Sequence, residues 1–555
     1  MIMKKIYILI TGVVLLLATS CNDYLKEENL SYISTDKLYE TADGYEGLVN
    51  SCYSSLRDIF GGDPWLYCAG TDMYVEGMAS QPEGLSEYKY LVPSDGYVSA
   101  FYENLYKIIQ LNNTAIYYND KTEKVETLEQ RKAEVRFLRA LAYFKLVQHF
   151  GGVGIVTDMI DKPVVAFERN SAEEVYTFII SELEDILSVL PETTNEYGRA
   201  TKRAVNHYLA KVYLTRGYET FGTKSDFDKA ANYAEAAING QGLTLSFEEV
   251  FTPGNEENEE VIFSVQYGLE SMVDVSKDGN KQNLHFGPRL GGSGNEGGYP
   301  YRSDRLICTM YVINLFTEAD SRWEATFMTQ IYKRYYDYYD EAGSRDELYV
   351  DLYYPHTWQL ADTAAWRAAS PYRANAVIIP YGPLWDRTEV NGTGNREALS
   401  LKKFDDPKSV FSSSGSSTRD VILARLSETY LIAAEAYLKA GNTAKAADMI
   451  NVVRTRAAKP GHAAEMQLSA SEMSIDKILD ERALELAGEY HRWEDLKRTG
   501  TLIERTKKYN RDIKDLFDIG NPFMGTDGEL KILRPIPQEA LDLNQNDDFP
   551  QNPGY

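Results

Sequence analysis

The chain has 555 residues, with 58 Lys and Arg against 83 Asp and Glu and a formal net charge of -25 at pH 7. This excess of carboxylates repels nucleic acid, which proteins hold mainly by neutralising phosphates with Lys and Arg, and no basic stripe interrupts it. With 43% hydrophobic and 25% charged residues, the composition is that of a globular protein and excludes the disordered and collagen-like classes.

Aromatic residues are the unusual part of the composition. The chain has 41 Tyr, 20 Phe and 6 Trp, which together make 12% of its residues. Tyr combines an apolar face with a hydroxyl that favours water, so the surplus indicates surface recognition rather than core packing.

The first 20 residues are typical of an export signal. Lys4 and Lys5 precede an apolar run from Ile6 to Leu17, and small residues follow it up to Cys21. The run is about a dozen residues long, shorter than the roughly 20 that a membrane-spanning helix needs, and no later stretch approaches that length.

Because the run stops at a cysteine, the segment resembles a bacterial lipoprotein signal, with Cys21 as the lipid attachment site. Residues 21–36 would then be a polar tether between the anchor and the body. A plain secretory signal followed by an unrelated cysteine is the alternative, since Ala18 stands where lipoprotein signals usually carry Leu.

The remaining cysteines cannot all pair. Cys52 and Cys68 are near in sequence and form the candidate disulfide, with Cys308 left over. The alternative is that all three are small buried thiols.

Apolar spacing with Gly and Pro punctuation predicts an α-helical platform. The predicted helices cover residues 37–59, 99–118, 126–149, 171–190, 201–219, 227–239, 418–440, 443–457 and 475–498. Three of them share a pattern of small residues followed by a tyrosine, at Tyr143, Tyr213 and Tyr437. The last two are each followed by a helix that opens Lys-Ala-Ala, so the repeated unit is a tetratricopeptide-like helix pair. The irregular spacing of the copies argues against a regular solenoid.

Residues 240–417 lack this periodicity and predict a large, loop-rich, irregular insertion. The stretch is glycine-rich at 287–298 and Tyr-dense at 332–339. Long irregular stretches within a compact fold are more often functional than not, because rigid elements position loops and loops make the contacts. The predicted fold is therefore mainly α, with the ligand site on the insertion.

No motif in the sequence indicates catalysis, a metal or a cofactor. A G-x-G-x-x-G pattern at 292–297 has neither a strand before it nor a helix after it, and the six histidines lack the spacing of zinc ligands. Glu481 and Glu485 lie one helical turn apart and could form an acid pair for glycoside hydrolysis. The adjacent Arg482 and the apolar pattern favour salt-bridged helix packing instead.

Aromatic residues outside the predicted helices are the leading candidates for ligand contact. A sugar ring presents a C–H face and a polar rim, so an exposed aromatic plane beside Asn, Asp and Arg can hold it. The predicted ligand-binding residues are Trp65, Tyr67, Tyr74, Tyr299, Tyr301, Trp358, Trp366 and Trp385, and Tyr381 lies in the same stretch. Core packing or a partner interface are the alternatives for these rings.

Several motifs in the same order resemble the SusD/RagB family. One runs from Ile478 to Arg498, and another closes the chain from Leu533 to Tyr555. Further similarities are the lipoprotein start Cys21-Asn-Asp-Tyr-Leu and four short motifs, at residues 136–140, 150–153, 434–437 and 453–454. The resemblance covers nearly the whole chain, with residues 37–555 as a single SusD-like domain and 499–555 as its irregular C-terminal segment.

The resemblance implies a surface-exposed outer-membrane lipoprotein without enzymatic activity. Such a protein binds a nutrient, usually an oligosaccharide, and delivers it to a SusC-like TonB-dependent transporter that faces its helices. Acidic residues after Cys21, namely Asp23, Glu27 and Glu28, resemble a surface-export signal, and Trp323 and Trp493 would have structural roles. A peptide ligand, a surface glycoside hydrolase and a ligand-free helical scaffold are the alternatives.

Overall fold

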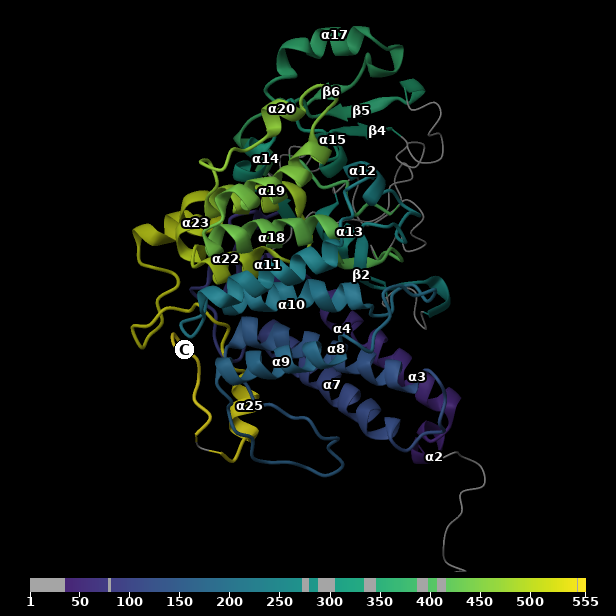
Figure 1. Ribbon diagram of the computed structural model, residues 1–555. Helices are drawn as coiled ribbons and strands as arrows, with labels where there is room; N and C mark the ends of the chain where they lie inside the picture. Colours follow the sequence, from purple (N-terminus) through teal and green to yellow (C-terminus); the bar gives the residue numbers. More distant parts are fainter. Residues whose placement is uncertain are drawn as a thin grey trace, which may run out of the picture.

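The structure is a computed structural model that describes residues 35–77, 81–271, 279–287, 305–333, 346–386, 398–406, 416–546 and 548–555. The predicted signal and Cys21 lie outside these residues. Figure 1 shows a stack of long helices that carries a layer of short strands and helices at one end. The predicted mainly α fold is therefore confirmed.

Seven long helices form the stack. They are α7 (Gly96–Asn119), α8 (Leu128–Phe150), α9 (Ala172–Ile186), α10 (Lys202–Arg216), α11 (Lys224–Ile238), α18 (Leu426–Ala440) and α19 (Thr443–Ala457). Each packs on the next in this order, and α18 packs on α11 although the whole insertion separates them in sequence. The wide sequence spacing of the helix pairs therefore does not interrupt the stack.

The repeated tyrosine has the same contacts in two successive helix pairs. Its hydroxyl donates to a Glu of the preceding helix and accepts from a Lys of the following helix. The two sets are Tyr213 with Glu184 and Lys229, and Tyr437 with Glu235 and Lys445. The Lys of each set is the one that opens the Lys-Ala-Ala motif, so the sequence repeat corresponds to a repeated packing unit.

Shorter helices flank the stack at both ends of the chain. The N-terminal ones are α2 (Thr35–Tyr39), α3 (Ala42–Ser54), α4 (Arg57–Phe60), α5 (Trp65–Cys68) and α6 (Glu83–Glu87). The C-terminal ones are α20 (Ala463–Met466), α21 (Ile475–Glu485), α22 (Arg492–Thr499), α23 (Leu502–Tyr509), α24 (Arg511–Lys514) and α25 (Gln538–Leu543). None of the helices within the described residues has both the length and the apolarity needed to cross a membrane.

Three predicted helices need correction. The first part of 418–440 is a strand, β7 (Val421–Arg425), which pairs antiparallel with β2 (Val261–Val265). Residues 475–498 form two helices, because the chain turns between them at Gly488, whose φ of +78° is favourable only for glycine. Residues 37–59 are likewise divided among α2, α3 and α4.

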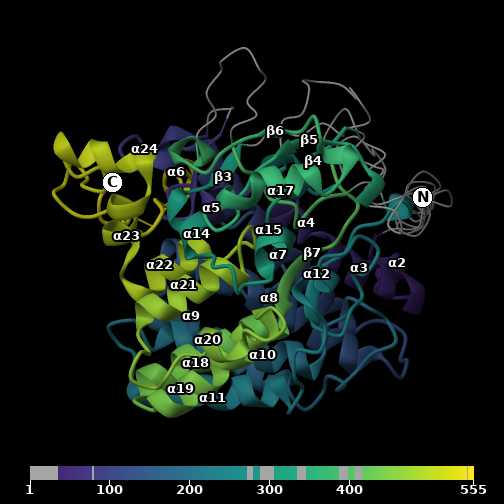
Figure 2. The ribbon, with the colours of Figure 1, turned by 90° about the horizontal axis from the view of Figure 1, so that it is seen from above.

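The described part of the insertion is irregular, as predicted, and short strands tie it to the rest. β1 (Tyr74–Glu76) pairs with β3 (Leu306–Cys308), and β5 (Val350–Tyr353) lies between antiparallel β4 (Gln330–Tyr332) and parallel β6 (Val377–Ile378). Its short helices include α12 (Phe247–Val250), α13 (Gln282–Phe286), α14 (Met310–Leu315), α15 (Arg322–Thr326) and α17 (Thr363–Ala368). Figure 2, seen from above, shows β4, β5, β6 and α17 well away from α11, α18 and α19.

The cysteines of the described residues are not bridged. Cys52, Cys68 and Cys308 are buried free thiols, so the candidate disulfide between Cys52 and Cys68 is absent. Burial raises the pKa of the Cys308 thiol to about 12, which keeps it protonated.

Candidate functional site

Four of the eight predicted ligand-binding aromatics are buried. Trp65, Tyr67 and Tyr74 are 1%, 2% and 1% exposed, and Trp385 is 0% exposed. The expectation that these rings stand at the surface is therefore wrong. Tyr299 and Tyr301 lie outside the described residues and stay predictions.

The buried rings are covered by parts of the chain distant in sequence. Tyr67 stacks on Tyr490 at a centroid separation of 5.1 Å, and the backbone N–H of Gly488 donates to the Tyr74 hydroxyl at 2.5 Å. Both partners belong to the segment between α21 and α22. Tyr67 and Tyr74 thus hold the C-terminal helices to the N-terminal part of the chain.

Trp358 and its neighbours form a partly exposed aromatic group on the insertion. We call Trp358, His356 and Tyr381 the aromatic shelf. The Trp358 ring stacks on His356 at 3.7 Å, and His356 lies 5.1 Å from Tyr381. Beneath the shelf, the buried Trp323 meets His356 edge-on at 4.8 Å, and Trp385 lies 5.4 Å from Tyr381. The half-buried rings of Trp358 and Tyr381 are therefore supported from below by the core.

His356 is held in one neutral form. Its Nδ1 accepts a hydrogen bond from the backbone N–H of Thr357 at 2.8 Å, so its proton lies on Nε2, 3.2 Å from the carbonyl oxygen of Ile313. Burial lowers the pKa of His356 to about 4, against a smaller opposing effect of that carbonyl. The shelf is therefore uncharged at neutral pH.

Polar groups lie beside the shelf. The Tyr381 hydroxyl donates to the exposed Asn314, and Gln359 Oε1 accepts from the backbone N–H of His356 at 3.0 Å. Gln359 Nε2 reaches Glu324 Oε1 at 3.5 Å. An aromatic plane flanked by amide and carboxylate groups matches the C–H face and hydroxyl rim of a sugar.

Trp366 lies on α17 and is half-buried. It stacks on Tyr353 at 4.0 Å, and the Arg373 guanidinium carbon lies 5.2 Å from its ring centroid. Trp358 also has a stacked partner, so the nearby cation is what distinguishes Trp366 from it. Nearby, Tyr349 is 60% exposed and meets Tyr372 edge-on at 5.0 Å.

The acidic residues of the C-terminal motif are buried and ion-paired. Arg322 Nη1 lies 2.7 Å from Glu481 and 2.9 Å from Glu485, and Arg425 lies 2.6 Å from Glu485. Burial opposes ionisation of Glu485, but Arg456, Arg425 and Arg322 outweigh it and hold its pKa well below the ordinary value. The predicted salt-bridged packing is confirmed, and a carboxylate held this way is unsuited to general acid work.

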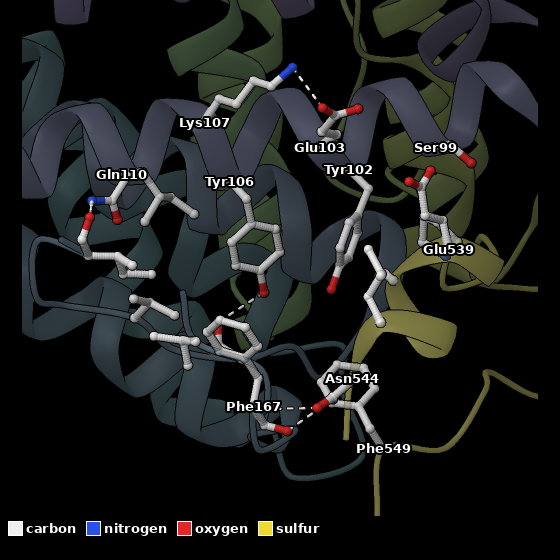
Figure 3. Close-up of a pocket in the computed structure, with 18 residues that line it drawn as sticks. Ser99, Tyr102, Glu103, Tyr106, Lys107, Gln110, Phe167, Glu539, Asn544 and Phe549 are labelled. Atoms are coloured by element: carbon white, nitrogen blue, oxygen red, sulfur yellow. Dashed lines mark hydrogen bonds and ion pairs between the residues drawn. The ribbon is translucent and has the colours of Figure 1, made fainter. Parts of the chain in front are cut away.

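The structure also has an apolar groove that the sequence did not single out. A cavity of about 610 Å³ lies between α7, the segment 154–167 and α25 (Figure 3). Tyr102, Tyr106, Phe167 and Phe549 are among the residues that line it. Both tyrosines fall within the predicted helix 99–118, where no role was predicted for them, although their spacing by four along one helix was the available signal.

Two known families together match nearly the whole chain. Residues 217–555 match the SusD family, and residues 23–214 match a family described as "Starch-binding associating with outer membrane". The chain is 26% identical to "SusD-like protein P2" of Formosa agariphila, over 98% of this chain and 99% of that one. It is 28% identical to "Starch-binding protein SusD" of Bacteroides thetaiotaomicron, over 81% and 77% of the two chains.

A solved structure has the same fold. The structure of "Surface glycan-binding protein A from Bacteroides thetaiotaomicron in complex with laminarihexaose" is 19% identical and superposes with a TM-score of 0.67. The similarity covers 93% of this chain and 100% of that one. Since the first family alone matches more than half of the residues, the chain belongs to the SusD family.

Proposed function

We propose that the chain is a cell-surface lipoprotein that binds an oligosaccharide and delivers it to a SusC-like TonB-dependent outer-membrane transporter. The aromatic shelf carries the proposal, since it presents the Trp358 ring from a support of core aromatics. A ring fixed in advance loses little conformational entropy when a ligand stacks on it.

Known proteins of the family support a glycan as the ligand class. One relative is named for starch binding, and one structure of the same fold was solved with laminarihexaose. The chemistry of the shelf agrees, because an uncharged aromatic plane beside amide and carboxylate groups suits the C–H face and hydroxyl rim of a sugar.

Delivery to a transporter does not require tight binding. Stacking on one aromatic ring is worth about 1–3 kcal/mol where it has been measured for nucleobases, so two or three rings give modest affinity. If the carrier stays attached to the transporter, transfer is effectively intramolecular at roughly millimolar local concentration. The helical stack is the surface that we assign to this partner.

The test is calorimetry on soluble protein, residues 22–555, with laminarihexaose, maltooligosaccharides and short peptides. We expect one glycan class to bind, and Trp358→Ala to weaken that binding at least tenfold because the stacking plane is lost. Trp366→Ala should weaken it less. The matched control is Tyr117→Ala, which removes a 40% exposed ring from α7 and should leave affinity unchanged.

Other results would count against parts of the proposal. Binding that survives Trp358→Ala would remove the shelf from the site. Binding of peptides in place of glycans would change the ligand class. Release of shortened glycan after long incubation would instead favour a hydrolase.

A further inference from the structure

The groove beside α7 is built as a preformed binding surface, separate from the shelf. Its floor is one face of α7, where Ser99, Tyr102, Tyr106 and Gln110 follow one another at helical spacing (Figure 3). Within the part of the chain that the structure describes, none of the residues that line it comes from the insertion. Whatever occupies the groove therefore binds independently of the aromatic shelf.

Hydrogen bonds fix the walls of the groove to the floor and to each other. The Tyr106 hydroxyl donates to the carbonyl of Gly154 at 2.9 Å, which ties α7 to the segment 154–167. Asn544 accepts from the backbone N–H of Phe167 at 2.9 Å and donates to its carbonyl at 3.1 Å, which ties that segment to the chain after α25. A groove held open in this way needs no rearrangement to accept a ligand.

The apolar surface continues from the groove onto its rim. Val164 is 47% exposed and Leu543 is 69% exposed, and both line the cavity. The adjacent Val165 is 49% exposed. A contiguous apolar patch of this kind on a soluble surface marks a place where another molecule is bound.

Carboxylates outnumber basic side chains in the segments that form the groove. Residues 154–169 contain Asp158, Asp161 and Glu168 against Lys162 and Arg169, and α25 contains Glu539 and Asp542 with no base. Among the described residues that line the cavity, Lys107 is the one lysine, and it is paired with Glu103 at 2.8 Å. The rim therefore favours an occupant whose apolar side chains are flanked by positive charge.

We propose that this groove binds an amphipathic segment of a partner protein, with large apolar side chains on one face and Lys or Arg beside them. From Ser99 to Gln110 the floor is about 16 Å long, which matches roughly three turns of helix. Apolar side chains of the segment fill the cavity between Tyr102, Tyr106, Phe167 and Phe549, in the manner of a helix in a groove. This docking site shares no residue with the proposed glycan site, and its floor, α7, belongs to the helical stack that we assign to the transporter.

The probe is a fluorescently labelled dodecapeptide with Leu and Phe at helical spacing and Lys at the other positions. A scrambled peptide of the same composition separates groove binding from plain charge attraction, and fluorescence anisotropy measures both on residues 22–555. We expect the ordered peptide to bind at least tenfold more tightly. Equal binding of the two peptides, or none, would overturn the proposal.

Two matched double variants locate the site. Val164→Asn with Leu543→Gln should weaken peptide binding at least tenfold, whereas Val125→Asn with Val189→Asn, at two valines that are each 44% exposed elsewhere, should not. Glu539→Gln should weaken it about twofold to threefold at low salt through the lost carboxylate. Equal affinity of the two double variants would contradict the assignment.

Two further measurements test whether peptide binding is independent of the glycan site and whether a second copy of the chain occupies the groove. Trp358→Ala should bind the peptide like wild type, so a failure of the glycan proposal leaves this result intact. Sedimentation velocity of the protein alone tests for self-association. A dimer that the Val164 and Leu543 changes dissociate would show that a second copy occupies the groove and would overturn the proposal.

Discussion

The helical stack and the insertion use aromatic residues in different ways. In the stack, Tyr213 and Tyr437 are buried, and each hydroxyl lies between a Glu of the preceding helix and a Lys of the following helix. Both rings therefore serve packing. In the insertion, Trp358 lies half-buried on top of His356. The difference shows that aromatic composition alone does not indicate a binding surface, and it is the reason that we place the proposed ligand site on a supported ring at the edge of the core.

The largest predicted effect concerns Arg322, a buried residue that joins the insertion to α21. Arg322→Ala leaves Glu481 and Glu485 with less positive charge in a buried site, so the free energy of unfolding should fall by about 3–5 kcal/mol. Arg373→Ala, at the exposed edge of the insertion, should cost about 0–1 kcal/mol. Denaturant unfolding measures both free energies. Similar losses of stability in the two variants would contradict the distinction between the buried and the exposed ion pair.

The second prediction concerns pH. Burial lowers the pKa of His149 to about 4, against opposing effects of Glu494, so it is neutral in the folded chain. In the unfolded chain it binds a proton near pH 6.5, so stability is fully present above that pH and is lost as the pH falls toward 4. Each such histidine contributes a slope of up to about 1.4 kcal/mol per pH unit.

The same direction holds for His207, His285 and His491, whose pKa values burial also lowers. Thermal unfolding between pH 7 and pH 4.5 should therefore show a steep fall in melting temperature. His462→Gln, which removes an exposed histidine, is the matched control. A flat profile over this range would mean that the buried histidines titrate normally.

The smallest predicted effect tests the repeated packing unit. Tyr213→Phe removes the hydroxyl between Glu184 and Lys229 but keeps the ring, so it should cost about 1 kcal/mol. Tyr437→Phe should cost a similar amount, because its partners are equivalent. A large difference in stability between the two variants would show that the two equivalent packing units do not contribute equally to the free energy of unfolding.

Most helices of the stack follow from the sequence, because apolar periodicity is a local signal. The prediction 443–457 agrees with α19 in full, and 99–118 lies within α7. The strand at Val421–Arg425 was missed since a short apolar run that leads directly into a helix has no period of its own. The packing of α18 on α11 depends on contacts across the insertion, which no local pattern reports.

The candidate site was harder to predict, because exposure depends on distant parts of the chain. Trp65 and Tyr67 follow Gly-Gly-Asp-Pro and suggested an exposed loop, but they form a short helix that lies against α22. Trp358 has a similar local sequence character and remains half-buried at the surface. The difference arises from the segment around Tyr490, which is far away in sequence and covers Tyr67.

The most direct test of the proposed glycan site is hydroxyl-radical footprinting of residues 22–555 with and without the oligosaccharide that binds best. We expect ligand to protect Trp358 and Tyr381 from oxidation while Tyr117 on α7 reacts at the same rate. Protection of Tyr102 and Tyr106 in the groove, with Trp358 unchanged, would place the glycan on the helical stack and contradict the proposed site.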